Sequence, residues 1–502
     1  MRPSTIGATR HKTSVLVLVV CIAVLMLTVG IPAIASAHAS SAPAGANWGS
    51  HTIVVTPNAI HNDTADLQAA FNTCTSNNWV CTIQLVKGTY YTDQIAATGF
   101  QGSVVGAGQG STVIQALPNL PSPAPAYSTP TLSFWVAPPS ASNPWPVILT
   151  FIGGSFQMSR LTISDPYYAP DQGYYWDGVY YTALFSTVLV TGTQADAQFD
   201  HVTVLGGPGD FGVYNTANAI WFAGFILQPG WTNDDELLPL SGDFAVTNSY
   251  FYYVDSGPWV WNLVNSDITV CYNTAVIAGG PYGFFDTYGS VVTFCGNRAS
   301  DVEYGAGILV WQGEQVFSTV PTSVSIFGNF LQVSDESNGI LLMDATNSLS
   351  AVVSGNVIQT NTSCGCYLSD EPDAWTDSAI TSVGLASVVV SGNTILGGGA
   401  AGVYVSGSLV FGGDTYGGPA TVSGNAILSS VVGVWVDYTN DTHVSGNLIW
   451  NSAEWGIAVT DGSSNNLIAF NIVKNSGQYD LYWDGTGVGN TWAHNIYKTS
   501  NF

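Results

Sequence analysis

The segment Val-Ser-Gly-Asn-Thr-Ile at residues 390–395 decides the fold, because it returns as Val-Ser-Gly-Asn-Ala-Ile at 422–427 and Val-Ser-Gly-Asn-Leu-Ile at 444–449. Weaker copies extend from residue 244 to the end of the chain. Their asparagines are Asn248, Asn273, Asn297, Asn329, Asn356, Asn393, Asn425, Asn447, Asn471 and Asn495. The spacings between them are 25, 24, 32, 27, 37, 32, 22, 24 and 24 residues. A base period near 24 with insertions indicates a solenoid of stacked repeats.

Each repeat contains short alternating runs of Val, Ile and Tyr, which predict strands rather than helices. Three short strands and three turns fit into one repeat, so stacked coils pair each strand with its copy about 4.8 Å away. We expect the repeated Asn at a tight turn, in the left-handed conformation that Asn tolerates. Its side-chain amide is expected to bond from coil to coil as a ladder. A propeller is less favoured, because its blades are about forty residues long.

Six cysteines follow residue 39, and an even number in an exported chain predicts disulfides. Cys271 and Cys295 both precede a repeat asparagine by two residues. Stacking therefore brings them within the Cα separation of a disulfide. Cys74 and Cys81 form a second predicted pair, whereas the pairing of Cys364 and Cys366 stays open.

The N-terminal residues have the pattern of an export signal. Basic residues at positions 2, 10 and 12 precede an apolar run over 15–29, and small residues follow up to Ala39. This pattern predicts a secretory signal peptide over residues 1–39 and a secreted mature chain. An uncleaved anchor is the alternative, but the run is short for a membrane span. We expect no membrane span after signal cleavage.

Residues 40–502 are predicted to form a single domain. Residues 50–115 are expected to hold the N-terminal cap and first coils, 116–242 coils with long loop insertions, and 243–502 the regular coils marked by asparagine.

Charge is low and one-sided. Charged residues make up 8% of the chain, with 8 Lys and Arg against 33 Asp and Glu. This acidic protein has no basic surface for binding nucleic acid. A small number of basic residues suits a protein in an acidic environment, where carboxylates are protonated and many basic side chains would repel one another.

The sequence has no metal-binding motif. No Cys/His group has zinc spacing, and no acidic group matches a calcium loop, so we expect no metal or cofactor. Calcium stays open as an alternative without a motif.

The N-terminal region carries a resemblance. It reads Asn-Asp-Thr-Ala-Asp-Leu-Gln at 62–68, Gly-Thr-Tyr at 88–90, and Gly-Ala-Gly at 106–108 before Thr-Val-Ile at 112–114. This resembles the opening of right-handed parallel β-helix proteins of the pectate-lyase-like superfamily. Over most of residues 50–502 it implies an all-β, right-handed parallel β-helix (a solenoid). A short helix, capped by Asn62 or Thr64, is expected to cover the first coil.

The resemblance does not define an activity. The superfamily hosts lyases, hydrolases, epimerases and non-enzymes, and none of its catalytic motifs is found in this sequence. Site residues must therefore come from the pattern of the repeats themselves.

A second pattern in each repeat begins with Gly, as in segments 307–311, 402–405 and 433–437. Alternation along this strand turns every second side chain outward. The outward positions, predicted to contact sugar rings, are Trp259, Trp261, Phe285, Trp311, Tyr404, Trp435 and Tyr482. The alternative is that inserted loops cover these rings as a second core.

Acidic residues flank the same strand. Carboxylates on neighbouring coils lie about 5–10 Å apart, a separation that suits acid/base hydrolysis of glycosidic bonds. The candidate catalytic residues are Glu303, Glu336, Asp286 and Asp255. The alternative is that acids occur here because solvated turns favour them.

These patterns predict a secreted carbohydrate-active protein that binds or acts on a neutral polysaccharide or cell-surface glycan, with glycoside hydrolysis as the favoured reaction. The second interpretation is a non-catalytic glycan-binding or structural matrix protein, capable of end-to-end self-association through its last coil. A polysaccharide lyase or epimerase is less favoured. Only five bases follow the signal peptide, and an acidic surface repels polyuronates.

Overall fold

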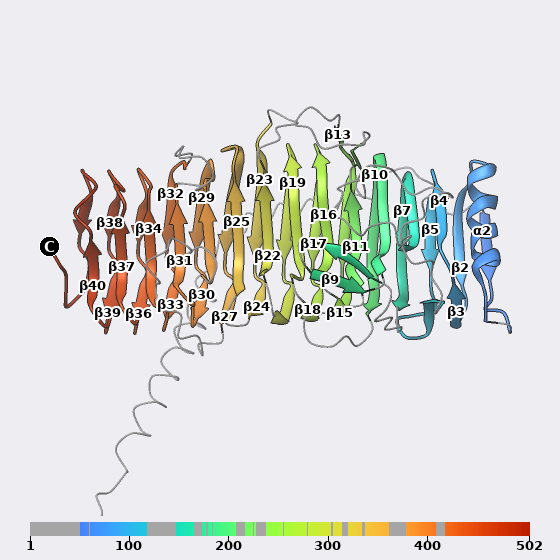
Figure 1. Cartoon of the computed structure of the whole chain (residues 1–502), viewed down its shortest axis with the longest axis horizontal. Helices are drawn as coiled ribbons and strands as arrows, with labels where there is room; N and C mark the ends of the chain where they lie inside the picture. Colours follow the sequence, from blue (N-terminus) through green and yellow to red (C-terminus); the bar gives the residue numbers. More distant parts are fainter. Residues whose placement is uncertain are drawn as a thin grey trace, which may run out of the picture. The chain divides into compact units, whose positions relative to one another are not determined.

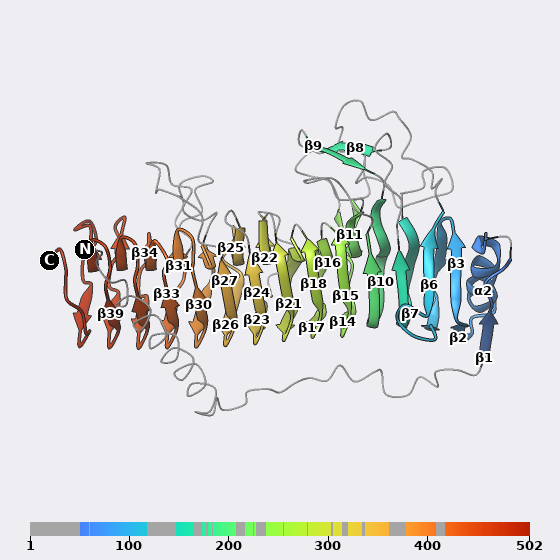
Figure 2. The same cartoon turned by 90° about the horizontal axis from the view of Figure 1, so that it is seen from below.

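Alternating apolar residues fold each repeat into a coil of three strands in the computed structural model. Every strand lies beside its counterpart in the next coil (Figure 1; Figure 2 shows the stack from below). Pairing between successive coils is parallel and in register, as in Val390 opposite Val422 and Ile395 opposite Ile427. The chain is thus a right-handed parallel β-helix, as the sequence predicts.

The structure describes residues 51–502 except 60, 118–146, 165–172, 177–178, 183, 207–215, 224, 227–236, 255, 279, 303–304, 314–319, 334–336, 361–377 and 408–416. The predicted signal peptide, Cys364 and Cys366 lie outside the described residues. The coils belong to one unit, residues 47–502. No helix within the described ranges is long and apolar enough to cross a membrane.

The strands form three parallel sheets, which we call sheets I, II and III in the order in which each regular coil passes through them. Sheet I contains β1 (His51–Val55), β2 (Val80–Leu85), β5 (Gln101–Val105), β14 (Asp243–Thr247), β17 (Asp267–Cys271), β20 (Val291–Cys295), β23 (Thr322–Phe327), β26 (Leu349–Ser354), β29 (Ser387–Ser391), β32 (Ala420–Ser423), β35 (His443–Ser445), β38 (Leu467–Ala469) and β41 (Thr491–Ala493). Sheet II contains β3 (Gly88–Thr92), β6 (Thr112–Ala116), β15 (Tyr250–Val254), β18 (Thr274–Ala278), β21 (Arg298–Val302), β24 (Phe330–Val333), β27 (Val357–Thr360), β30 (Thr394–Leu396), β33 (Ala426–Leu428), β36 (Leu448–Trp450) and β39 (Ile472–Lys474).

Sheet III contains β4 (Ile95–Thr98), β11 (Thr216–Ala223), β16 (Ser256–Val264), β19 (Tyr282–Tyr288), β22 (Gly305–Gln312), β25 (Ser337–Asp344), β28 (Ile380–Val383), β31 (Ala401–Ser406), β34 (Val432–Asp437), β37 (Trp455–Thr460) and β40 (Tyr479–Trp483). Two long strands, β7 (Val147–Ser164) and β10 (Leu184–Leu205), each run through all three sheets. Two small antiparallel pairs lie inside the predicted insertions: β8 (Gly173–Trp176) with β9 (Val179–Thr182), and β12 (Phe225–Ile226) with β13 (Leu237–Leu238).

The repeated asparagines form the predicted ladder. From Asn297 to Asn495, the Oδ1 of each accepts both the backbone N–H and the side-chain Nδ2–H of the asparagine one coil earlier, and all of these except the half-buried Asn495 are buried. Asn393, for example, receives these bonds from Asn356 at 2.9 and 3.0 Å. It donates its own Nδ2–H to Asn425 at 3.0 Å and to the carbonyl of Val353 at 3.0 Å. The ladder runs from Asn273 to Asn495.

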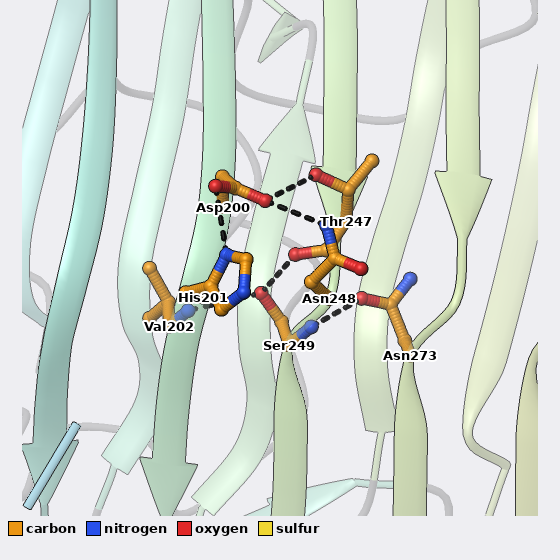
Figure 3. A network of polar contacts seen from close by, with 7 residues as sticks. All are labelled: Asp200, His201, Val202, Thr247, Asn248, Ser249 and Asn273. Carbon is orange, nitrogen blue, oxygen red and sulfur yellow. Dashed lines mark hydrogen bonds and ion pairs between the residues drawn. The ribbon is translucent and has the colours of Figure 1, made fainter.

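Two sequence expectations about this turn are wrong. The left-handed residue is the one before the asparagine, such as Gly392 with φ 63°, and not the asparagine itself. The first position of the ladder holds Ser249 instead of the predicted Asn248. Ser249 donates its backbone N–H to Asn273 Oδ1 at 2.9 Å (Figure 3). The true spacing is therefore 24 residues, and Asn248 occupies the left-handed position with φ 50°.

The N-terminal end is closed by the predicted helix, α2 (Thr64–Ser76), which lies beside the first coil (Figure 1). Its inner face buries Leu67, Ala70, Phe71 and Cys74. The N-cap residue is Asp63 rather than Asn62 or Thr64. Its carboxylate accepts the backbone N–H groups of Asn58 and Tyr91 at 2.6 and 2.9 Å and thereby ties the helix start to sheet II.

Both predicted disulfides are present. Cys74 and Cys81 join α2 to β2, and Cys271 and Cys295 face each other on adjacent strands of sheet I, with a Cα separation of 4.5 Å.

At the C-terminal end, the tail covers the edge of β40. Leu481 donates to the carbonyl of Thr499, and the rings of Trp492 and Phe502 are 4.7 Å apart. The predicted end-to-end association remains a prediction.

We expect Asn393→Ala to destabilise the fold by about 3 kcal/mol, because it removes hydrogen bonds worth about 1 kcal/mol each and leaves the buried Asn356 amides unpaired. Ser391→Ala, two residues away on the outer side of the same turn, is the matched control and should change the free energy of unfolding by less than about 0.5 kcal/mol. Urea unfolding measures both variants. Equal effects of the two changes would show that the ladder does not stabilise the stack.

Candidate functional site

The outer surface of sheet III is built from two parallel columns of side chains. Because the register is continuous, one residue of each coil falls in each column. The first column runs Trp221, Trp259, Gly283, Leu309, Leu341, Thr381, Tyr404, Trp435, Ala458, Tyr482. The second, two residues further along each strand, runs Ala223, Trp261, Phe285, Trp311, Met343, Val383, Ser406, Asp437, Thr460. All seven outward aromatic positions that the sequence predicts to contact sugar rings lie in these columns.

The aromatic residues gather in two groups. The first contains Trp259, Trp261, Phe285 and Trp311. Its rings follow one another at 4.8 Å from Trp259 to Phe285 and 5.7 Å from Phe285 to Trp311. Gly283 makes room for Trp259, because a Cβ there would lie 2.3 Å from the indole ring. Trp311 is 36% exposed, so this group presents an aromatic surface to solvent.

The second group contains Tyr404, Trp435, Trp455 and Tyr482. The rings of Trp455 and Tyr482 are stacked at 4.2 Å with 4° between their planes, and Trp435 packs edge-on against Tyr404 at 5.4 Å. Buried apolar side chains, including Leu341 and Met343, lie between the two groups. Three coils separate Trp311 from Tyr404, or about 14 Å.

A pair of carboxyl groups, one buried and one exposed, lies beside the second group. Asp437 is 6% exposed, and it accepts hydrogen bonds from Tyr404 Oη at 2.8 Å and from Thr460 Oγ1 at 2.7 Å. Its carboxyl group is also hydrogen-bonded to that of Asp461, which is exposed on the next coil. Burial, followed by the contact with Asp461, raises the pKa of Asp437 to about 7, although the bonds from Thr460 and Tyr404 act to lower it.

The surroundings hold this pair in place. Trp435 Nε1 donates a hydrogen bond to Thr460 Oγ1 at 2.8 Å. Because Thr460 also donates to Asp437, the second aromatic group and this carboxyl group belong to one hydrogen-bond network. The Asp461 backbone N–H donates to Asp484 Oδ2 at 2.7 Å and thereby places a third carboxylate one coil further on. A carboxyl group whose pKa is raised in this way can give or take a proton near neutral pH, and in this pair that group is Asp437.

Among the four predicted catalytic acids, the structure describes only Asp286. It accepts hydrogen bonds from the Gly313 amide at 2.8 Å, Tyr288 Oη at 3.2 Å and Trp261 Nε1 at 3.3 Å. Burial raises its pKa despite these three bonds. Asp286 thus lies against the first aromatic group. Glu303, Glu336 and Asp255 lie outside the described residues, and their roles remain predictions.

Tyr404 differs from the sequence expectation. It occupies the outward column, but it is 6% exposed and directs its hydroxyl to Asp437, so it holds the acid and does not form an open surface. Sequence reasoning selected neither Asp437, Asp461 nor Trp455. The signal was present in Gly-Val-Trp-Val-Asp at residues 433–437, where the acid follows the outward Trp by two residues.

The profile of a protein family described as "Periplasmic copper-binding protein (NosD)" matches residues 241–502, slightly more than half of the chain. The chain belongs to the NosD family. The match covers the regular coils of this NosD-family protein, including the ladder from Asn273 onward, the second aromatic group and the carboxyl pair. A search of curated protein sequences gave no match.

Several solved structures are similar to this NosD-family protein in fold. They include the periplasmic alginate epimerase AlgG (10% identity, 83% of this chain and 76% of that chain, TM-score 0.35). A GH87 α-1,3-glucanase from Streptomyces thermodiastaticus has 11% identity, covers 91% and 71%, and has a TM-score of 0.45. A tailspike protein of bacteriophage CBA120 has 10% identity, covers 85% and 56%, and has a TM-score of 0.35. At these values, no conclusion about activity follows.

The raised pKa of Asp437 predicts a pH dependence of stability. An acid with a higher pKa in the folded than in the unfolded chain binds its proton more tightly when folded, so acidification stabilises the fold. The gain develops as the pH falls through about 7 toward the ordinary value of 3.8. We expect the melting temperature to rise from pH 8 to pH 5, and Asp437→Asn to remove part of that rise. Asp441→Asn, an exposed neighbour, is the control. An unchanged pH profile in Asp437→Asn would contradict the assignment.

Proposed function

We propose that this chain is an exported protein that binds a neutral polysaccharide along the outer surface of sheet III. Export is supported by the predicted signal peptide, by two disulfides and by the periplasmic description of the family. We place the mature protein outside the cytoplasm, secreted or at the cell surface.

The observation that carries the proposal is the pair of aromatic groups on one face. Aromatic rings in a row offer flat apolar surfaces that match the apolar faces of sugar rings. Trp311, Trp435 and Tyr482 lie in columns fixed by the coil register. Together the two groups extend over more than three coils, which suits a chain of sugars better than a single one.

Charge favours a neutral ligand on this face. The described strand segments that lie in sheet III contain no Lys or Arg, while Asp286, Asp344, Asp437 and Asp480 lie on it. A polyuronate would meet like charge here without a cation to neutralise it. The same absence disfavours the lyase and epimerase reactions at this surface.

Hydrolysis is a second proposed function, favoured by the Asp437–Asp461 pair. The carboxyl group of Asp461 lies beside that of Asp437, and hydrolysis of a glycosidic bond by acid/base catalysis uses two such groups. Asp437 would donate the proton to the glycosidic oxygen, and the pair would recover one from the attacking water. The aromatic group of Trp435, Trp455 and Tyr482 would hold the sugar beside it.

Copper binding, which the family description names, does not fit the described residues. Copper sites use imidazole, thiolate and thioether ligands. Within the described ranges, no three His, Cys, Asp or Glu side chains gather where they could hold a metal, and the four described cysteines form disulfides. We therefore do not carry copper binding over to this chain.

The test is a screen of the purified protein against neutral polysaccharides, with binding and reducing-end release read together at pH 5 and pH 7. We expect Trp435→Ala to weaken binding about tenfold, and Asp437→Asn to abolish release while binding persists. Trp450→Ala, a partly exposed indole on sheet II, is the control for the ring, and Asp441→Asn is the control for the acid.

The outcomes separate the two functions. Binding without release would leave a glycan-binding protein and exclude the hydrolase. Release that survives Asp437→Asn would assign the chemistry to another acid. A protein that binds none of the neutral polysaccharides, or binds them equally well after Trp435→Ala, contradicts the proposed function.

A further inference from the structure

The corner between sheets I and II is a single row of left-handed residues, one from each coil between Arg160 and His494, which we call the corner ridge. In six successive coils this residue is glycine: Gly296, Gly328, Gly355, Gly392, Gly424 and Gly446, with φ between 61° and 66°. Glycine is expected there, because a left-handed conformation costs other residues roughly 1–2 kcal/mol. The corner is also the part of each coil that does not adjoin sheet III.

Side chains replace glycine in the coils on either side of this series. In the last two coils they are Phe470 and His494, with φ of 59° and 55° and stacked rings 5.1 Å apart. Four successive coils on the N-terminal side also break the rule. Arg160, His201, Asn248 and Tyr272 occupy the ridge with φ of 59°, 54°, 50° and 61°. They follow Ser159, Asp200, Thr247 and Cys271, which are paired in register, so neighbouring ridge residues are one strand spacing apart. All four are exposed, and Tyr272 is 63% exposed. Stability alone would favour glycine at these positions, so the side chains point to a role outside the fold.

A polar network organises this part of the ridge (Figure 3). Asp200 accepts hydrogen bonds from Thr247 Oγ1 at 2.9 Å and Asn248 Nδ2 at 2.8 Å, and it lies 2.8 Å from His201 Nδ1. Burial acts to raise the pKa of Asp200, but the bonds from Asn248, His201 and Thr247 outweigh it and lower the pKa. An ionised Asp200 orients the imidazole through Nδ1 and leaves Nε2 for a ligand.

Basic residues concentrate on the same side of the molecule. Lys87 and Arg160 lie where sheet I passes into sheet II, and Arg298 and Lys474 lie on sheet II itself. Lys498, in the C-terminal tail, follows Ile496, which bridges Ile472 of sheet II. These are all five bases that follow the predicted signal peptide. Among the described residues, the only ion pair is His201 with Asp200, so Arg160 has no carboxylate partner there.

Asp200 is the acid within this network, and a larger group of acidic residues lies elsewhere. Those described on sheet III, or where it passes into sheet I, are Asp196, Asp243, Asp267, Asp286, Asp344, Asp437, Asp441, Asp461, Asp480 and Asp484. A five-residue strand of sheet I spans about 17 Å and separates this acidic side from the ridge. Because the Debye length is about 8 Å at physiological salt, the acidic side is largely screened from a ligand at the ridge.

We propose that Arg160, His201, Asn248 and Tyr272 form a second binding site, on the corner ridge, for an acidic glycan whose sugars carry carboxylate or phosphate groups. The planar guanidinium of Arg160 binds such a group through two parallel hydrogen bonds. His201 and Asn248 add hydrogen-bonding groups at successive strand spacings, and the ring of Tyr272 offers a face to a sugar. The site goes beyond the neutral-glycan surface of sheet III and lies on the other side of the coil.

Glycine variants test the site without straining the backbone. We expect Arg160→Gly/His201→Gly to weaken binding of polygalacturonate, or of a glycerol-phosphate polymer, about tenfold or more. The melting temperature should stay equal or rise, since glycine fits the left-handed position. Tyr272→Gly should weaken binding by a smaller factor. Lys474→Gln, which removes a base at the far end of sheet II, is the control and should change affinity less than about twofold.

Further readouts separate this site from sheet III. Binding of the acidic polymer should weaken as salt rises from 50 to 300 mM, as expected for ionic contacts. A neutral polysaccharide found in the screen should bind the double glycine variant unchanged. The proposal is overturned if the wild-type protein binds neither acidic polymer, if the double variant keeps full affinity, or if only vesicles of phosphatidylglycerol bind.

Discussion

The buried asparagine ladder is the interaction on which the rest of the structure depends. Each rung joins a backbone N–H and a side-chain amide of one coil to the side chain of the next, as Asn356 is joined to Asn393. These groups lie in the interior, where an amide without a hydrogen-bond partner destabilises the fold. A shift of register by one residue would leave several of these amides without partners at once. The ladder therefore fixes the register of successive coils, and insertions of different length between rungs leave that register unchanged.

A fixed register turns single positions of the repeat into columns. On sheet III it aligns Trp259, Trp435 and Tyr482 with one another and places Asp437 in the neighbouring column, two residues beyond Trp435. On the opposite corner it aligns left-handed residues, which are glycine in six coils and carry side chains over the four coils from Arg160 to Tyr272 and at Phe470 and His494. The molecule thereby separates an acidic, aromatic face from a side that holds its few bases. Net charge alone, which disfavours any acidic ligand, does not describe this separation.

The parts that could be predicted from the sequence are those that repeat. The period, the ladder, the outward aromatic positions and the disulfide between Cys271 and Cys295 all follow from counting along the chain. The expectations that failed depended on a single residue's place in the turn: Ser249 replaces Asn248 in the ladder, and the preceding residue takes the left-handed conformation. Burial could not be read from spacing either. Asp437 and Asp286 have raised pKa values because of their surroundings, and Tyr404 is buried although it points outward.

The central claim is that sheet III is the glycan-binding surface. The most direct measurement is a crystal structure of the protein soaked with a neutral oligosaccharide taken from the screen. The account predicts sugar rings lying flat against the group of Trp435, Trp455 and Tyr482, with a glycosidic oxygen within hydrogen-bond distance of Asp437. Oligosaccharide bound elsewhere, with this surface bare at saturating concentration, would contradict the account.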